Sequence, residues 1–365
     1  MCSIYLNILF NIFRFSGHIK SARNLSCIIR FFTLRLLAFS MNTLRSKLAH
    51  VPAPLGGLAL GIASLGWSLE NAGNFGGALQ LTGALISGVL LVLLLGKITL
   101  AHTAIFEDLK HPVVGSVLPT TAMALMIVSY AIAQYSFAVG QMLWLLGIAL
   151  HLTFLCAFTY HRVKNFNLQH MVPSWFVPPV GIIVAAVSFP GGVFEGFANA
   201  LLWFGLVAYA IMLPMMLYRL IFHPEVPDAA KPTIAILAAP ASLSLAGYLT
   251  LAPSPSPIMV AVLGGIAVAM TALIYLSFLR LFRLPFSPGF SAFTFPLVIG
   301  ATALFKAVTW MESLGANASL VAQIRALAHI ELYVAAAVVL YVSFKYLTFF
   351  APALMPARVT EQQPN

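Results

Sequence analysis

The sequence predicts an all-α polytopic membrane protein with ten transmembrane helices, arranged as five tandem helical hairpins whose inner, proline-kinked members surround a central pore. The first observation is composition, since 61% of the 365 residues are hydrophobic and 8% are charged, with a mean hydropathy of +0.97. A soluble domain would need far more polar surface. The second is proline, which recurs at nearly regular intervals near the centre of alternate apolar segments, at Pro119, Pro178, Pro179, Pro240 and Pro296.

The third observation is the length of the apolar segments. A helix needs about 20 apolar residues to cross about 30 Å of hydrocarbon, and ten segments meet this requirement. They lie at residues 54–70, 76–101, 113–131, 136–160, 173–190, 194–220, 231–250, 256–282, 288–309 and 325–350.

Short turns join these segments in pairs, which predicts the five hairpins. In each pair the first helix is short and rich in small residues or proline, and the second is longer and more uniformly apolar. Lipid solvates a uniformly apolar helix, whereas helices with glycine, proline and hydroxyl groups pack closely or line a cavity. We therefore predict five inner helices around the pore and five outer helices facing lipid.

The first and third spans belong to the inner set. The first, PLGGLALGIASLGWSLEN, has Gly57, Gly61 and Ser64 at helical spacing, which favours close helix packing over a pore wall. In the third, Pro119 precedes Thr120. The threonine hydroxyl either satisfies the carbonyl group that proline leaves free or faces a permeating ion.

The fifth, seventh and ninth spans repeat this chemistry. The fifth contains Pro178 and Pro179, and the seventh contains Pro240 followed by Ser242. Proline within a span survives only where protein or water satisfies the backbone. Each of these residues is therefore predicted to line the pore or to bend a helix around it.

The ninth span reads SAFTFP, so an aromatic residue directly precedes the kink. We predict that Thr294 and Pro296 line the pore or bend the helix. The two aromatic residues of this segment, Phe293 and Phe295, favour core packing when judged on the residues alone.

The placement of basic residues predicts the orientation. Four external turns, NAGNFG, AQYSF, PGGVFEG and APSPSP, contain no basic residue, and Arg325 is the exception outside. Such asymmetry matches the positive-inside rule, so both termini are predicted to be cytoplasmic, with the chain in a bacterial inner (plasma) membrane. The predicted cytoplasmic basic residues are Arg45, Lys47, Lys97, Lys110, Arg162, Lys164, Arg219, Lys231, Arg280, Arg283, Lys345 and Arg358.

Three regions follow from this pattern: an N-terminal extension at 1–40, a transmembrane domain at 41–350 and a short cytoplasmic tail at 351–365. The extension has three interpretations. It is an upstream stretch with Met41 as the true start, which we favour, an interfacial basic amphipathic helix, or an organellar transit peptide.

Composition also limits the partners. The formal net charge of +10 is explained by topology, so we predict no binding to nucleic acid. The three cysteines, Cys2, Cys27 and Cys156, lack metal-ligand spacing. We predict no metal site, no cofactor and no disulfide framework.

A few polar residues lie within or beside the predicted spans. Lys306 and Glu331 either form a structural ion pair, or Lys306 attracts anions at the pore mouth. His151 is interpreted as a neutral, hydrogen-bonded residue, and His329 as an interfacial one. The loop at 106–112, FEDLKHP, favours a capped, solvated connection over a pH-sensitive element.

Several segments resemble the tellurite-resistance/C4-dicarboxylate transporter family, which includes bacterial TehA, fungal malate permeases and plant slow anion channels. The resemblance runs from about Val51 to Phe350. It rests on the opening PLGGLALGIASLGWSLEN, on EDLKHPVVGSVLPTTAM, VPSWFVPPVGIIVA and KPTIAILAAPASLSLAGYL, and above all on SAFTFPLVIGATAL.

The resemblance implies a homotrimer in which each protomer has its own pore. In that family a phenylalanine of the ninth helix plugs the pore, and the matching residue is Phe295, which becomes the predicted gate. Phe293 stays a predicted packing residue. Pro296 is similar to the plant channels, whereas TehA has glycine there, so gating is expected to differ from TehA.

The predicted function is a gated anion channel, or channel-like exporter, for small anions such as chloride and nitrate. The alternative is a secondary transporter of C4-dicarboxylates such as malate, or a tellurite-resistance exporter, with or without proton coupling. An intramembrane enzyme is disfavoured because the sequence contains no HExxH motif, no GxSxG motif and no acidic pair at mid-membrane depth.

Overall fold

A computed structural model describes the backbone of residues 41–354 and the side chains of residues 41–351. Residues 41–49 are helical and belong to a contact unit that ends at His50. The predicted extension at 1–40 lies outside the described residues, as does most of the tail at 351–365. The fold below is that of the second unit, which begins at Val51.

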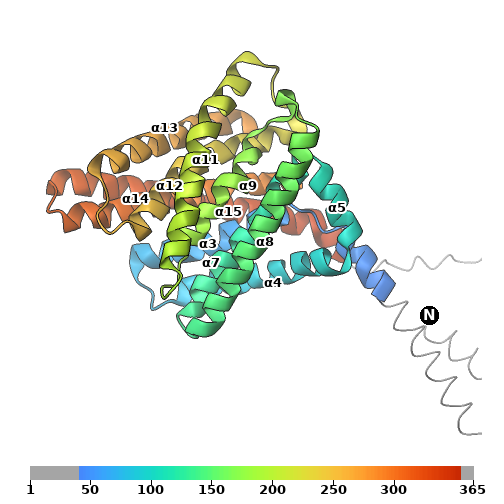
Figure 1. Cartoon of the computed structure of the whole chain (residues 1–365), viewed down its shortest axis with the longest axis horizontal. Coiled ribbons are helices and arrows are strands. Elements are labelled where there is room, and N and C mark those ends of the chain that lie inside the picture. Colours follow the sequence, from blue (N-terminus) through green and yellow to red (C-terminus); the bar gives the residue numbers. More distant parts are fainter. Residues whose placement is uncertain (1–40, 355–365) are drawn as a thin grey trace, which may run out of the picture. The chain divides into compact units, whose positions relative to one another are not determined.

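This unit is built from helices that follow one another in hairpins (Figure 1). The longer and inner elements are α3 (Leu55–Gly73), α4 (Ala78–Leu100), α5 (His102–Lys110), α6 (Val114–Val117), α7 (Pro119–Ala133), α8 (Phe137–Lys164), η2 (Pro173–Phe176), α9 (Val177–Val180), η3 (Gly181–Ile183), α10 (Val184–Val187), α11 (Glu195–Phe222), η4 (Asp228–Ala238), α12 (Ala239–Leu251), α13 (Pro257–Leu281), η5 (Pro288–Phe293), α14 (Phe295–Ser313) and α15 (Ala318–Leu354).

Within the described residues, eight helical segments are long and apolar enough to cross a membrane. The other two predicted spans correspond to α3 and to the broken segment Pro173–Val187. An all-α polytopic membrane protein is therefore confirmed, and the count of ten crossing helices stays a prediction.

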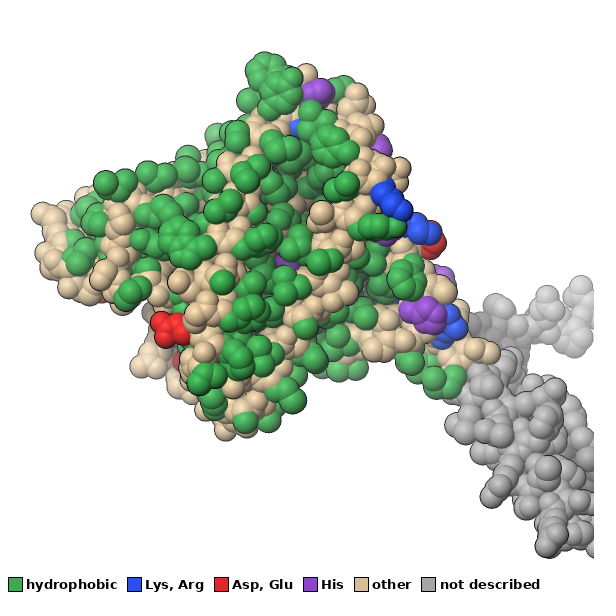
Figure 2. Space-filling view, viewed as in Figure 1, with side chains coloured by type: hydrophobic (Ala, Val, Ile, Leu, Met, Phe, Trp, Pro, Cys, Tyr) green, Lys and Arg blue, Asp and Glu red, His purple; other side chains and the backbone are tan. Residues whose placement is uncertain are grey.

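Burial separates the spans into two sets. The apolar windows of Val114–Ala133, Asp228–Leu251 and Pro288–Ser313 are 83%, 78% and 78% buried, whereas those of α4, α8, α11, α13 and α15 are only 28% to 39% buried. Hydrophobic side chains cover the outer helices on the face shown in Figure 2, and Lys and Arg side chains gather near α5. The outer helices thus present the apolar surface that lipid requires.

The inner elements form a closed ring. α3 contacts α7 and α14, α10 contacts α7 and α12, and α12 contacts α14. Each outer helix packs behind its hairpin partner, as α4 does on α3 and α15 does on α14. Five inner segments that are far apart in sequence therefore face one another.

Three of the predicted kink prolines lie at helix starts rather than inside continuous α-helices. Pro119, Pro240 and Pro296 each occupy the first or second position of an α-helix, and a break or a 3-10 segment precedes each of them. The first turn tolerates proline because its N–H has no helical partner in any case. Each of these spans is therefore made of two pieces, which is the physical form that the predicted kink takes.

The structure differs from the sequence prediction at the last helix and before the third span. The last helix begins at Ala318 rather than at 325, because the side chain of Asn317 accepts hydrogen bonds from the N–H groups of Ser319 and Leu320. Arg325, the external exception, pairs with Glu312. A second difference is α5, which is helical where a connection was predicted.

Candidate functional site: the apolar interior of the inner ring

The break between η5 and α14 positions Phe295. The hydroxyl of Thr294 lies 2.7 Å from the carbonyl oxygen of Ser291 and 3.0 Å from that of Gly57. Pro296 follows in the first turn of α14. The start of α14 is thereby fixed to α3, and the direction of Phe295 is fixed with it.

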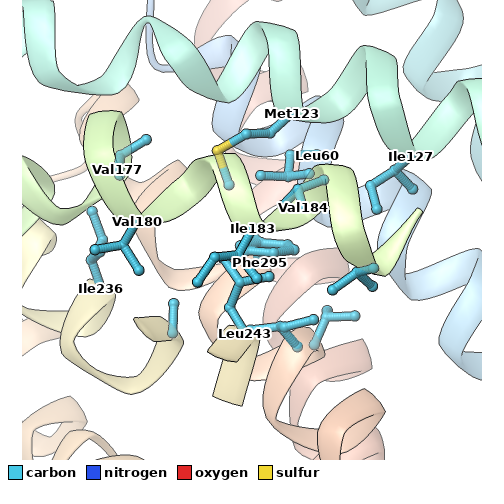
Figure 3. Packing of buried hydrophobic residues seen from close by; sticks show 14 of the residues in the cluster. Leu60, Met123, Ile127, Val177, Val180, Ile183, Val184, Ile236, Leu243 and Phe295 are labelled. Carbon is cyan, nitrogen blue, oxygen red and sulfur yellow. The ribbon is translucent and has the colours of Figure 1, made fainter. Parts of the chain in front are cut away.

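Phe295 lies inside the ring. Its side chain is 5% exposed and belongs to one packed apolar cluster. Figure 3 shows it among buried side chains from the other inner spans, namely Leu60, Met123, Ile183 and Leu243. The aromatic ring of α14 and apolar side chains from the four other inner spans therefore occupy the same region.

Phe293 has different surroundings. Its ring centroid lies 4.9 Å from that of Phe290, 5.6 Å from that of Phe278 and 5.5 Å from that of Phe282. Phe278 belongs to the outer helix α13 and Phe282 directly follows it. Phe293 thus packs between an inner and an outer element, in agreement with its predicted role.

Hydroxyl groups satisfy the broken backbone of two further inner spans. Thr120 donates to the carbonyl oxygen of Val117 at 2.6 Å, and Ser242 donates to that of Ala238 at 3.0 Å. This geometry favours the backbone-satisfying interpretation of both residues. Thr121 differs, because its buried hydroxyl has no hydrogen-bond partner.

The fifth span is broken most extensively. Pro178 and Pro179 lie in the four-residue helix α9, and 3-10 segments flank it on both sides. His151 of α8 is fully buried, and its Nε2 lies 2.8 Å from the carbonyl oxygen of Pro178. That distance places the ring proton on Nε2 and matches the prediction of a hydrogen-bonded histidine.

The small residues of α3 allow two backbones to approach. A Cβ atom on Gly57 would lie 3.0 Å from Ser291 Oγ, and one on Gly61 would lie 2.5 Å from Thr294 Cβ. These contacts support close packing as the role of the glycines. Ser64 is buried, and its hydroxyl has no hydrogen-bond partner.

Lys306 and Glu331 do not form the ion pair that the sequence allowed, since no ion pair in the described part of the chain joins them. Glu331 Oε2 instead lies 2.6 Å from the position that a Cβ on Gly300 would take. Lys306 is six residues farther along α14, about 9 Å along the helix axis. His329 packs edge-on against Phe305 at 5.1 Å.

The predicted connection at 106–112 contributes to a partly buried ion pair that the sequence did not reveal. Lys97 Nζ lies 2.7 Å from Asp108 Oδ2 and 2.7 Å from the carbonyl oxygen of Val51. His111 Nδ1 accepts from backbone N–H groups at the start of the third span, as a capped connection requires. The sequence identified Lys97 only as a cytoplasmic basic residue, because its partner is 11 residues away on another helix.

The sequence also gave no reason to single out Thr271 and Tyr275. They lie four residues apart in α13, and both hydroxyl groups are without a hydrogen-bond partner. Two hydroxyl-bearing residues on one face of an otherwise apolar helix are the signal that could have indicated them.

Comparison with known proteins agrees with this geometry. Residues 54–347 match the model of the SLAC1 family, described as voltage-dependent anion channels. Two proteins of Methanocaldococcus jannaschii, each described as an uncharacterized transporter, are 26% identical over 215 residues. The alignments cover 52% of this chain and 63% and 62% of the two relatives, so the chain spans less than two thirds of their length.

Proposed function

This chain belongs to the SLAC1 family of voltage-dependent anion channels, and we propose that it is a gated anion channel, or channel-like exporter, that carries small anions such as chloride and nitrate. The family and the relatives described as transporters support a role in transport. The protein is integral to a membrane.

One observation carries the proposal: Phe295 packs against side chains of the inner spans at the interior of a closed ring. Leu60, Ile183 and Leu243 are all buried there. An aromatic ring in this position blocks passage sterically and excludes water, and a hydrophobic constriction gates by dewetting. Phe295 is thus the proposed gate, and this structure corresponds to the closed state.

The broken spans supply the preference for anions. α7, α12 and α14 begin partway along their spans, so their N-terminal N–H groups carry partial positive charge within the membrane. A path of this kind has no tight fixed site. It selects by the cost of dehydration and favours weakly hydrated anions such as nitrate. Lys306, which forms no described ion pair, is proposed to attract anions toward the path.

Anion flux into proteoliposomes tests the gate. Phe295→Ala should raise chloride and nitrate flux by about tenfold or more, because it removes the ring that fills the path. Phe293→Ala is the matched control, since it removes an equal volume from the aromatic packing beside α13. Equal flux in the two variants, with both proteins folded, would contradict the assignment.

Transport of a C4-dicarboxylate such as malate is the second candidate, supported by the relatives described as transporters. A dianion requires concentrated positive charge in the membrane. A malate transporter should show saturable malate flux that is driven by a proton gradient. Phe295→Ala should not increase this flux. Voltage-dependent chloride or nitrate flux that Phe295→Ala enhances would instead identify the channel. A tellurite-resistance exporter belongs to the same alternative.

We further propose that the functional transmembrane domain is 41–350, that three copies assemble into a trimer, and that both termini face the cytoplasm. The gathering of basic side chains near α5 supports the orientation. Lipid and small anions are the proposed partners.

A further inference from the structure

A buried polar cluster lies where α13 and α15 pack against α14. It consists of Glu331 from α15 and Thr271 from α13, which lie beside the backbone of Gly300, together with Tyr275 one turn from Thr271. Glu331 and Thr271 are each only 2% exposed. Oε2 of Glu331 and both hydroxyl oxygens have no hydrogen-bond partner.

Two oxygens of this cluster lie against the backbone of α14. Glu331 Oε2 and Thr271 Oγ1 lie 2.6 Å and 3.6 Å from the position that a Cβ on Gly300 would take. Tyr275 lies one turn from Thr271 on α13. A side chain at position 300 would have to displace the end of the Glu331 side chain.

None of the three side chains that make up the cluster is basic. On α14 the basic residue nearest to Gly300 in the sequence is Lys306. Among the described residues, it forms no ion pair with Glu331. On α15, His329 packs against Phe305. Glu70, the acidic residue of α3, accepts hydrogen bonds from the turn after that helix and does not face the cluster. On α13 the titratable group beside Thr271 is Tyr275, one helical turn away.

A carboxyl group in these surroundings is expected to hold a proton. An ionised carboxylate without a partner is costly in an apolar interior and in a membrane. Hard cations such as sodium need several oxygen ligands, whereas the cluster offers one carboxyl group and two hydroxyls. A proton therefore fits the site better than a metal ion.

We propose that Glu331 is a proton-binding site whose charge controls the position of α14 and, through it, the gate; the gating part rests on the proposed function. Gly300 follows Phe295 by five residues, so the two lie about 140° apart around the helix axis. Phe295 faces the ring while Gly300 faces Glu331. Loss of the carboxyl proton to water leaves a carboxylate that must gain water or donors, which displaces it from α14.

The first experiment detects the proton directly and does not depend on transport. Infrared difference spectra of the reconstituted protein are recorded between about pH 5 and about pH 8, the range in which a perturbed carboxyl group titrates. A carbonyl band of a protonated carboxyl group should disappear as pH rises. This band should be absent in Glu331→Gln and retained in Glu195→Gln, which removes an exposed carboxyl group of α11. A band that Glu331→Gln retains overturns the site.

The second experiment tests the gating. Chloride flux in proteoliposomes should rise several-fold with pH in the native sequence and in Glu195→Gln, and stay low and flat in Glu331→Gln, which mimics the protonated state. Thr271→Val should move the midpoint to higher pH, because a hydroxyl that can turn to the carboxylate is lost.

The outcomes separate the two proposals. Absence of flux even in Phe295→Ala would defeat the proposed function, while the infrared band still decides the proton site. Flux with an unchanged pH profile in Glu331→Gln overturns control of the gate. A band or flux that responds to sodium ions at constant pH overturns proton binding in favour of a cation site.

Discussion

Single residues join the ends of the spans, and Lys97 is one of them. Its ammonium group is 4% exposed, and it joins the backbone before α3 to the carboxylate of Asp108 in α5. The second span, the start of the first span and the following helix are thereby held together. Lys110 and Glu107 form a pair of the same kind that is more than half exposed.

These two lysines make a matched prediction. Lys97→Met should destabilise the protein by about 2 kcal/mol, because it leaves the carboxylate of Asp108, which is 25% exposed, without its partner. Lys110→Met should change stability by less than about 0.5 kcal/mol. Thermal unfolding in detergent measures both. Similar losses in the two variants would show that burial does not set the strength of the pair.

Among the helices, the sequence indicated their order and the prolines at which the inner ones bend, but not that these spans consist of two separate pieces. Apolar length and proline placement indicated the spans, because both properties are local. The two-piece form of the inner spans depends on hydrogen bonds such as Thr294 to the carbonyl oxygen of Gly57, which joins residues 237 positions apart. Such contacts form only when the ring closes. For the same reason the sequence allowed an ion pair between Lys306 and Glu331, although the two residues lie at different positions along the axis of α14.

The close approach of α3 to α14 predicts that a larger residue at the contact lowers the stability of the protein. Gly61→Ala places a methyl group 2.5 Å from Thr294 Cβ, so the two elements must separate. We expect a loss of about 1–3 kcal/mol, the usual cost of overpacking. Gly88→Ala in α4 is the control, because nothing lies within 4 Å of the new methyl group. Unfolding temperatures that fall equally in both variants would exclude the contact as the cause.

For the whole molecule, the division into inner and outer spans follows from physics that the sequence displays. Uniformly apolar helices face outward, and helices with small residues, prolines and hydroxyl groups are buried, as the difference between 78% to 83% and 28% to 39% shows. The sequence did not predict the polar cluster at Glu331, because its residues come from two separate helices, α13 and α15.

For the whole molecule, the predicted orientation with both termini in the cytoplasm can be tested by labelling cysteines. In a chain that begins at Met41 and carries Cys156→Ser, cysteines are placed at Ser254 and Asn165, which are both exposed. A membrane-impermeant thiol reagent added outside intact cells should label the cysteine at 254 and leave that at 165 unlabelled until the membrane is opened. The reverse pattern would place both termini outside.

The central claim is that Phe295 closes a path through the inner ring. Its most direct test is chloride conductance in planar bilayers for a series of side chains at 295: alanine, leucine, phenylalanine and tryptophan. Conductance should fall as the volume of the side chain increases, with alanine the highest and phenylalanine and tryptophan near background. Conductance that does not depend on the side chain at 295, in folded proteins, would contradict it.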